Sequence, residues 1–310
     1  MTGGTGRFGA VLVAMATPFD AAGGLDLDGA ARLARFLVEQ GNDGLVVTGT
    51  TGESPTLGDD EKSRLWRAVV SAVDVPVIAG TSTADTAHSA ELTADALAAG
   101  VAGILAVTPY YSRPSQAGIE AHLRAIKDAA GDLPVLLYDI PVRTGRKVAP
   151  EVIVRLAAEG VLAGVKDATA NPAGSAALVA EAPDGFELYS GNDGDTLPLL
   201  AVGAVGVISV ESHWAAPEVG EMVGAFRKGD VDHARALNAR LVPSHRFQSS
   251  EEAPNPVPTK AMLRVLGQPG GACRPPMGPE PPGLAEAAAG ILAGLGRPAV
   301  PAVAAGPSRG

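Results

Sequence analysis

The sequence has little that could cross-link the chain or anchor it in a lipid bilayer. Its single cysteine, Cys273, excludes an internal disulfide and a metal site built from several cysteines. One thiol is compatible with the cytoplasm, where we expect the protein to work. The uncharged stretch at residues 196–210 is shorter than the roughly 20 apolar residues of a spanning helix, and Pro198, Gly203 and Gly206 interrupt it. We therefore expect no transmembrane segment and no membrane partner.

Positive charge is also scarce. Lys and Arg number 24 against 34 Asp and Glu, so the formal net charge is −10 and the pI is about 5.0. A protein that binds a phosphate backbone needs a basic face, so we expect no nucleic-acid partner. Hydrophobic residues make up 46% of the 310 residues and charged residues 19%, a composition that excludes a disordered or fibrous protein.

Short apolar runs without polar alternation recur along the chain. Strands of this kind, apolar on both faces, belong in a parallel sheet covered by helices. Their ends follow one another at intervals of roughly 20–30 residues, the length of a strand with its crossover helix. The expected strands are residues 10–16, 44–47, 76–79, 103–107, 134–138, 162–166, 187–190 and 206–209. The first of these could pass for a short signal peptide, but it fits better as a strand.

The segments between these runs have the pattern of amphipathic helices. Residues 28–40, 59–73, 83–99 and 115–129 are the expected helices, and the first, third and fourth end at or near glycine. Eight such units predict a (β/α)₈ TIM barrel, with an open doubly wound sheet as the competing fold. We expect the barrel to cover residues 1–228, a C-terminal helical region to cover residues 229–296, and residues 297–310 to form a flexible tail.

The active site of a barrel enzyme lies at the C-terminal ends of its strands. In this sequence those ends carry hydroxyl groups and three of the four tyrosines. The expected rim comprises residues 17–18, 49–53, 80–81, 109–111, 138, 166, 190–191 and 209. A polar rim on an apolar scaffold predicts a site for a small polar molecule.

Lys166 narrows the chemistry of that site. It ends an apolar strand, so its side chain should run through a hydrophobic core, where burial disfavours the ammonium form and lowers the pKa. A neutral amine can attack a carbonyl and form a Schiff base, and Tyr138 on the preceding strand could move protons to and from that adduct. The alternative is that Lys166 pairs with Asp167 and only closes the end of the strand.

The turn at residues 49–53, with the sequence GTTGE, also allows two interpretations. It is either a tight turn between strand and helix or a group of hydroxyl and amide donors able to hold a small carboxylate. It lacks the ending of a phosphate-binding P-loop. The five histidines show no metal-ligand spacing, so we interpret each as a surface or capping residue and expect no metal site.

The order of these motifs resembles that of the dihydrodipicolinate synthases, also called 4-hydroxy-tetrahydrodipicolinate synthases. The resemblance extends from about residue 8 to residue 258. Singly, the motifs are typical of the wider pyruvate-dependent Schiff-base aldolase family, which includes N-acetylneuraminate lyase; together with Arg143 they favour the synthases. The matching segments are residues 49–54 (GTTGES), 107–114 (VTPYYSRP), 138–145 (YDIPVRTG), 164–167 (GVKD), 190–191 (SG) and 206–210 (GVISV).

This resemblance implies a catalytic set. Lys166 corresponds to the Schiff-base lysine. Tyr138, Thr50 and Tyr111 correspond to a proton-relay triad, in which Tyr111 reaches across a dimer interface into the neighbouring site. The implied reaction is the condensation of pyruvate with L-aspartate-4-semialdehyde through an imine and an enamine, the first committed step of lysine and diaminopimelate biosynthesis.

The resemblance also implies substrate-binding residues. Thr51 corresponds to the residue that helps to hold the carboxylate of pyruvate, and Arg143 to the one that holds the carboxylate of the semialdehyde. Gly191 and Ile208 match positions that line the pyruvate pocket through their backbone. The family implies a lyase without a cofactor, with a (β/α)₈ barrel and a C-terminal helical region, that assembles as a homotetramer built from dimers.

Two alternatives remain open at this point. The first is a related aldolase or dehydratase that acts on a sugar acid, which would share the fold and Lys166. The second is a barrel that serves as a binding or regulatory subunit without catalysis, whose mark in the sequence would be loss of the lysine or the tyrosine. Asp139 and Val142 depart from the usual family pattern, which carries asparagine and a small residue there. The positions that bind lysine in feedback-inhibited members correspond here to Asp59, Lys62, Ala84 and His88, so we predict weak or absent lysine feedback.

Overall fold

Eight short parallel strands close into a barrel in the computed structural model, which describes residues 6–299. Each strand pairs with the next in sequence, and the eighth pairs with the first. The strands are β1 Val11–Ala14, β2 Gly44–Val47, β3 Val77–Gly80, β4 Gly103–Val107, β5 Val135–Asp139, β6 Gly164–Asp167, β7 Glu187–Ser190 and β8 Gly206–Ser209. The predicted (β/α)₈ barrel is confirmed, the open sheet is excluded, and no strand end differs from its expected position by more than two residues.

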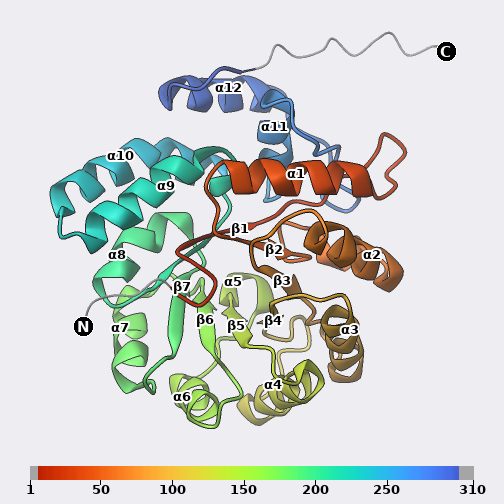
Figure 1. The fold of residues 1–310 in the computed structure, drawn as a ribbon, viewed down its shortest axis with the longest axis vertical. Coiled ribbons are helices and arrows are strands. Elements are labelled where there is room, and N and C mark those ends of the chain that lie inside the picture. Colours follow the sequence, from red (N-terminus) through yellow and green to blue (C-terminus); the bar gives the residue numbers. More distant parts are fainter. Residues whose placement is uncertain (1–5, 300–310) are drawn as a thin grey trace.

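Helices surround the barrel and cover its outer face (Figure 1). The helices are α1 Leu27–Glu39, α2 Asp59–Val70, α3 Thr86–Ala98, α4 Gln116–Ala130, α5 Pro141–Thr144, α6 Pro150–Ala158, α7 Pro172–Glu181, α8 Thr196–Ala201 and α9 Ser212–Arg227. Two short 3₁₀ helices, η1 Ser54–Thr56 and η2 Asp193–Asp195, follow β2 and β7. Three further helices complete the described chain: α10 Val231–Phe247, α11 Val257–Val265 and α12 Leu284–Gly294. Of these, α10 packs on α9, and α11 packs on α12.

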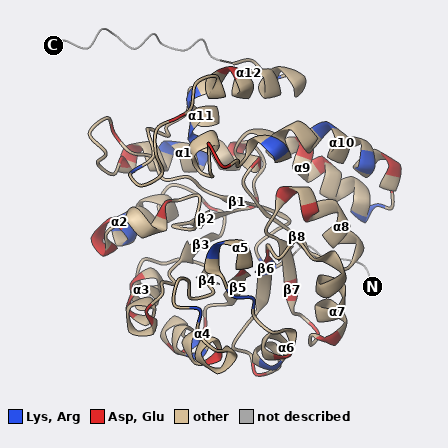
Figure 2. Ribbon diagram, turned by 180° about the vertical axis from the view of Figure 1, so that it is seen from behind, with Lys and Arg blue, Asp and Glu red and all other residues tan. Residues whose placement is uncertain are grey.

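The strands separate two apolar layers. Side chains such as Leu136 and Ile208 point inward and fill the barrel, whereas Leu137 and Val165 point outward against the helices. Successive residues of a strand point to opposite faces. This alternation decides which polar residues at the ends of the strands can reach the interior of the barrel. The charged residues are concentrated on the outer helices, as Figure 2 shows.

Two of the five histidines are buried, contrary to the interpretation of all five as surface or capping residues. His122 has 1% of its surface exposed and contacts the hydroxyl groups of Ser82 and Thr86 at 2.9 Å each. His213 is fully buried, and its Nε2 accepts a hydrogen bond from the Ala16 amide. Burial lowers the pKa of both imidazoles to about 4, so both are neutral structural groups that satisfy buried polar atoms.

The C-terminal end of the described chain contacts two helices through Arg297. Arg297, taken as the first residue of a flexible tail, donates a hydrogen bond to Glu218 at 2.8 Å. Its backbone amide also bonds to the Leu292 carbonyl. The rest of the expected tail, from residue 300 onward, lies outside the described residues. Within residues 6–299, no helix is both long and apolar enough to cross a lipid bilayer.

Candidate active site

Lys166 and Tyr138 face each other inside the barrel. They lie on neighbouring strands in direct register, so their side chains point to the same face of the sheet. The Lys166 amino group lies 4.3 Å from the centroid of the Tyr138 ring. Only 4% of the lysine and 6% of the tyrosine are exposed. The two side chains are therefore together in a protected space at the C-terminal ends of β5 and β6.

The surroundings of Lys166 shift its titration toward the neutral amine. Burial among apolar side chains lowers its pKa to about 8, with the positive charge of Arg143 acting in the same direction and the carboxylate of Asp193 against it. Removing an ammonium from water disfavours the charged form. About one-tenth of Lys166 is thus uncharged at pH 7, far more than for an exposed lysine, and this is the form that can act as a nucleophile.

Asp167 does not serve as the partner of Lys166. It follows the lysine in the strand and points outward, where its carboxylate accepts hydrogen bonds from the Ser175 hydroxyl and the Thr169 amide. The idea that Lys166 only closes a strand end by pairing with its neighbour is therefore wrong. Asp139 lies beside Asp167 on the same outer face, and burial, followed by the negative charge of Asp167, raises the pKa of Asp139 to about 7.

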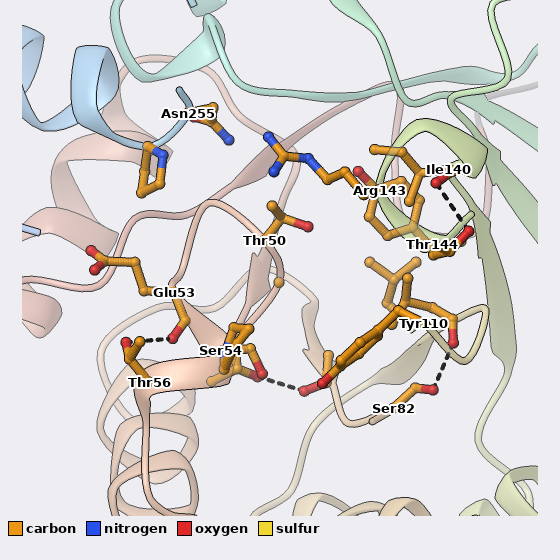
Figure 3. Close-up of a pocket in the computed structure, with 18 of the residues that line it drawn as sticks. Thr50, Glu53, Ser54, Thr56, Ser82, Tyr110, Ile140, Arg143, Thr144 and Asn255 are labelled. Atoms are coloured by element: carbon orange, nitrogen blue, oxygen red, sulfur yellow. Dashed lines mark hydrogen bonds between the residues drawn. The ribbon is translucent and has the colours of Figure 1, made fainter. Parts of the chain in front are cut away.

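A cavity of about 300 Å³ opens at this end of the barrel, in front of Tyr138. Tyr138 lines it together with Thr50 and Arg143. Figure 3 shows how the last two lie at the cavity. Lys166 is not part of the lining, but its amino group contacts the tyrosine ring that is. Burial raises the pKa of the Tyr138 phenol, while the Arg143 charge and the Thr50 side chain act against that shift. The phenol is therefore protonated at neutral pH and available as a proton donor beside two polar groups.

The turn after β2 has an unusual backbone. Thr48 and Glu53 both lie in the left-handed region, with φ of 58° and 54°. Side-chain bonds fix the start of the turn: the Thr48 hydroxyl donates to the Gly80 carbonyl and accepts from Trp66. Gly80 is required here, because a Cβ at this position would lie 2.5 Å from the Thr48 carbonyl oxygen. The GTTGE sequence thus forms a tight turn that presents Thr50 to the cavity.

Three other predicted site residues lie close to this centre but do not line the cavity. Thr51 is 2% exposed and lies in the same turn as Thr50. Ile208 is fully buried inside the barrel. Gly191 follows β7, where a Cβ would lie 2.9 Å from both the Ala168 side chain and the Asp167 carbonyl oxygen. The structure thus gathers seven of the eight predicted residues at one end of the barrel.

Tyr111 is the exception. Its side chain is 95% exposed and its backbone is left-handed, with φ of 68°. The adjacent Tyr110 lines the cavity instead. Tyr111 therefore contributes nothing to the cavity of its own chain, and it projects from the loop after β4 into the surroundings of the molecule.

Part of the cavity wall comes from segments that sequence reasoning did not identify. Ser82 lies after β3, and Asn255, Pro256, Pro276 and Met277 lie far along the chain, in the C-terminal helical region. No strand-end pattern marks these last four residues, since they belong to none of the eight repeated units. Asn255 and Pro256 fall within the stretch that resembles the family, residues 8–258, but the resemblance assigned them no role.

A buried charge network joins the C-terminal wall to the turn after β2. The Lys260 amino group lies 2.5 Å from a Glu53 carboxylate oxygen, and both side chains are 1% exposed. The other Glu53 oxygen accepts a hydrogen bond from the Arg274 backbone amide at 2.8 Å. The Arg274 guanidinium forms two bonds with Glu61, at 2.6 and 2.8 Å. Such bidentate pairs add geometric specificity, so the network fixes the C-terminal segment against the mouth of the barrel.

The ionisable groups of the described residues do not form a metal centre. Across residues 6–299, no three His, Cys, Asp or Glu side chains are grouped so that they could hold a metal ion. The polar side chains that line the cavity are hydroxyls, an amide, the Arg143 guanidinium and the Glu53 carboxylate, which is already paired with Lys260. This set is suited to binding carboxylates and carbonyl oxygens.

Comparisons with known proteins agree with this chemistry. The model of the Dihydrodipicolinate synthetase family matches residues 7–287. The 4-hydroxy-tetrahydrodipicolinate synthase of Acidothermus cellulolyticus is 52% identical over 272 residues, which cover 87% of each chain.

Two solved structures are similar over almost their whole length. The dihydrodipicolinate synthase DapA-2 of Bacillus anthracis superposes with a TM-score of 0.89 at 38% identity, covering 93% of this chain and 99% of the other. The enzyme of Cyanidioschyzon merolae, crystallised with lysine bound, gives a TM-score of 0.90 at 38% identity, with coverage of 94% and 99%.

Proposed function

Because the chain belongs to the dihydrodipicolinate synthetase family, we propose that it condenses pyruvate with L-aspartate-4-semialdehyde to give 4-hydroxy-tetrahydrodipicolinate. This is a lyase of the class I aldolase type. The relatives that carry this activity by name include one 52% identical over 272 residues. The reaction is the first committed step of lysine and diaminopimelate biosynthesis.

In this proposal Lys166 begins the reaction. Its neutral amine attacks the keto carbon of pyruvate, and loss of one water from the adduct gives an iminium ion. The iminium acidifies the neighbouring methyl group, and loss of a C3 proton gives an enamine. The pKa of about 8 supports this role, since it leaves the amine partly unprotonated at neutral pH.

The enamine then attacks the aldehyde carbon of the semialdehyde. A carbon–carbon bond forms, the aldehyde oxygen takes up a proton and becomes a hydroxyl, and the iminium is restored. The amino group of the semialdehyde adds to the iminium carbon and displaces the Lys166 amine, which closes the ring and frees the enzyme. We assign to Arg143 the binding of the semialdehyde carboxylate, because its guanidinium faces the cavity and can bind a carboxylate through two hydrogen bonds. For a chain of net charge −10, such a local positive group also attracts anionic substrates.

We propose that Tyr138 moves the protons of these steps, with Thr50 and Tyr111 as partners. Tyr138 contacts Lys166, and Thr50 lines the same cavity. Tyr111 can join them only from a second copy of the chain, a role consistent with its 95% exposed side chain. Thr51, Gly191 and Ile208 would hold pyruvate at the bottom of the site. We accordingly propose a homotetramer built from dimers, working in the cytoplasm, where amino-acid precursors are made.

The observation that carries the proposal is the pairing of a buried, partly neutral lysine with a tyrosine at the C-terminal end of a parallel barrel. The decisive experiment is reduction with borohydride in the presence of pyruvate, followed by peptide mass mapping. We expect a single modified peptide containing Lys166. Labelling of another lysine, or none at all, would contradict the assignment.

A coupled assay decides the second substrate. Pyruvate is offered with L-aspartate-4-semialdehyde in one arm, and with N-acetylmannosamine or glyceraldehyde in the others. We expect turnover with the semialdehyde. Turnover only with a sugar aldehyde would instead identify a sugar-acid aldolase that uses the same lysine.

A further inference from the structure

The hydroxyl group of Thr51 has one of its hydrogen-bonding positions already occupied. Thr51 is 2% exposed, and its Oγ1 accepts a hydrogen bond from Asn255 Nδ2 at 2.9 Å. A threonine hydroxyl has one proton to donate and two lone pairs. Among the hydrogen bonds of residues 6–299, none takes the Thr51 proton to a protein acceptor. The amide of Asn255 thus occupies a lone pair and leaves the proton free.

Asn255 is itself held in a fixed orientation. Its Oδ1 accepts a hydrogen bond from the Thr259 hydroxyl at 3.0 Å, and Thr259 is fully buried in the first turn of α11. With Oδ1 engaged by a donor, the Nδ2 group is the part of the amide that faces Thr51. Figure 3 shows the side chains of Asn255 and Arg143 directed toward the same part of the cavity, above Thr50 in this view.

We propose that Asn255 is a positioning residue, which directs the Thr51 hydroxyl proton toward the carboxylate of bound pyruvate. The chain of groups runs from Thr259 through Asn255 to Thr51, so the C-terminal helical region sets the orientation of a donor in the turn after β2. The inference rests on the proposed function, in which Thr51 holds that carboxylate.

A second contact between the same two segments supports this role. Lys260, the residue after Thr259, pairs with Glu53, two residues after Thr51. The turn is therefore held at two points by one short stretch around the start of α11. A donor fixed in this way loses little freedom when the substrate binds, which lowers the cost of binding.

Two substitutions of Asn255 test the orientation. In Asn255→Ala the Thr51 hydroxyl is free to rotate, and we expect the KM for pyruvate to rise about two- to tenfold, the value of an ordinary hydrogen bond. In Asn255→Asp both side-chain oxygens are acceptors, so the Thr51 proton turns toward the aspartate and a negative charge lies near the substrate carboxylate. We expect this nearly isosteric variant to raise the KM for pyruvate further. In both variants kcat and the KM for the semialdehyde should change much less.

A double variant separates positioning from general damage. If Asn255 acts through Thr51, then Asn255→Ala should have no further effect on the KM for pyruvate in a Thr51→Val background. Asn42 provides a matched control, since it is also buried and also joins two distant segments through Nδ2, to the carbonyls of Leu37 and Ser212. We expect Asn42→Ala to lower the melting temperature and leave the KM for pyruvate unchanged.

The half-saturating pyruvate concentration for borohydride trapping gives a readout that does not need turnover. If the unmodified protein is not labelled by pyruvate and borohydride, the proposed function fails. If the unmodified protein is labelled, two results would overturn only the positioning role. One is an unchanged half-saturating pyruvate concentration in Asn255→Asp. The other is an Asn255→Ala effect on the KM for pyruvate that is as large in the Thr51→Val background as in the unmodified protein. Should the alanine variant fail to fold, the aspartate variant decides the question alone.

Discussion

The amino group of Lys166 lies 4.3 Å from the centre of the Tyr138 ring, on the neighbouring strand and in direct register. A second tyrosine, Tyr189, lies on β7, the strand on the other side of β6, and is also in direct register with Lys166. The hydroxyl of Tyr189 reaches away to the carbonyl of Gly9 and the amide of Phe8. The lysine is therefore flanked by two buried tyrosines, of which only Tyr138 borders the cavity.

This arrangement gives a matched pair of variants. Tyr138→Phe keeps the ring against Lys166 and removes only the phenol, so we expect kcat to fall by about 10²–10⁴, the usual contribution of general acid–base catalysis. Tyr189→Phe should keep kcat within a few-fold and lower the melting temperature, because its hydroxyl bonds only structural groups. Steady-state kinetics and thermal denaturation of both variants provide the check. Equal losses of kcat in the two would show that the phenol of Tyr138 has no special role.

The pKa of Lys166 predicts a pH dependence for imine formation. Since burial lowers that pKa to about 8, the neutral, reactive fraction of the amine grows as the pH rises toward 8 and levels off above it. Below this value the rate of borohydride trapping at low pyruvate should fall about tenfold for each pH unit. A rate independent of pH between 6 and 9 would be incompatible with a titrating lysine.

The buried pair of Glu53 and Lys260 should be important for stability. Removing one partner leaves an unpaired charge in the interior, so we expect Glu53→Gln or Lys260→Met to lower the free energy of unfolding by about 3–5 kcal/mol. The double variant should recover part of this loss. Urea denaturation measures the effect. Asp232→Asn, at the exposed Asp232–Arg235 pair, is the control, and we expect it to change the free energy of unfolding very little. If the variants of the buried pair lose no more free energy of unfolding than the variant of the surface pair, the prediction is wrong.

The raised pKa of Asp139 predicts that the folded protein loses stability as the pH rises. Its pKa in the folded protein, about 7, is higher than in the unfolded chain, so between roughly pH 4 and 7 the folded state binds more protons and loses stability as the pH rises. Asn at this position keeps an oxygen for the Val148 amide and carries no charge. We expect Asp139→Asn to raise the free energy of unfolding by about 1–4 kcal/mol at pH 8 and by much less at pH 5. Denaturation at the two pH values checks this, and an equal effect at both would count against it.

Feedback by L-lysine should be weak or absent. At the positions expected to recognise lysine, the Asp59 carboxylate is already 3.0 Å from His88 Nε2 and 3.6 Å from the Lys62 amino group. The ammonium groups of a bound lysine would meet the like charge of Lys62 there. Initial rates measured against increasing L-lysine, beside a lysine-sensitive enzyme as positive control, give the test. An inhibition constant in the sub-millimolar range would refute the prediction.

Local sequence patterns were sufficient to predict the barrel. The eight apolar runs fall on the eight strands, because a strand covered on both faces must be apolar throughout. The same logic located Lys166 and Tyr138 at the ends of neighbouring strands. Residues whose position follows from the repeat were therefore predictable from the sequence.

Contacts between distant parts of the chain were not predictable in this way. The bond from Asn255 to Thr51 joins residues 204 positions apart, and the bond from Arg274 to Glu53 joins residues 221 positions apart. Nothing in the spacing of hydrophobic residues specifies such pairs. The buried state of His122 and His213 was missed for the same reason, since each contacts a partner from another unit of the barrel.

The stretch around Asn255 has a consequence for how the protein matures. All eight strands are synthesised before the residues that fasten the threonine turn leave the ribosome. The place for the first substrate can therefore be complete only after the last strand and the start of α11 have both been synthesised. Engineering that removes the distal end of the chain would accordingly weaken substrate binding and stability together, because it would also leave the buried Glu53 carboxylate without Lys260.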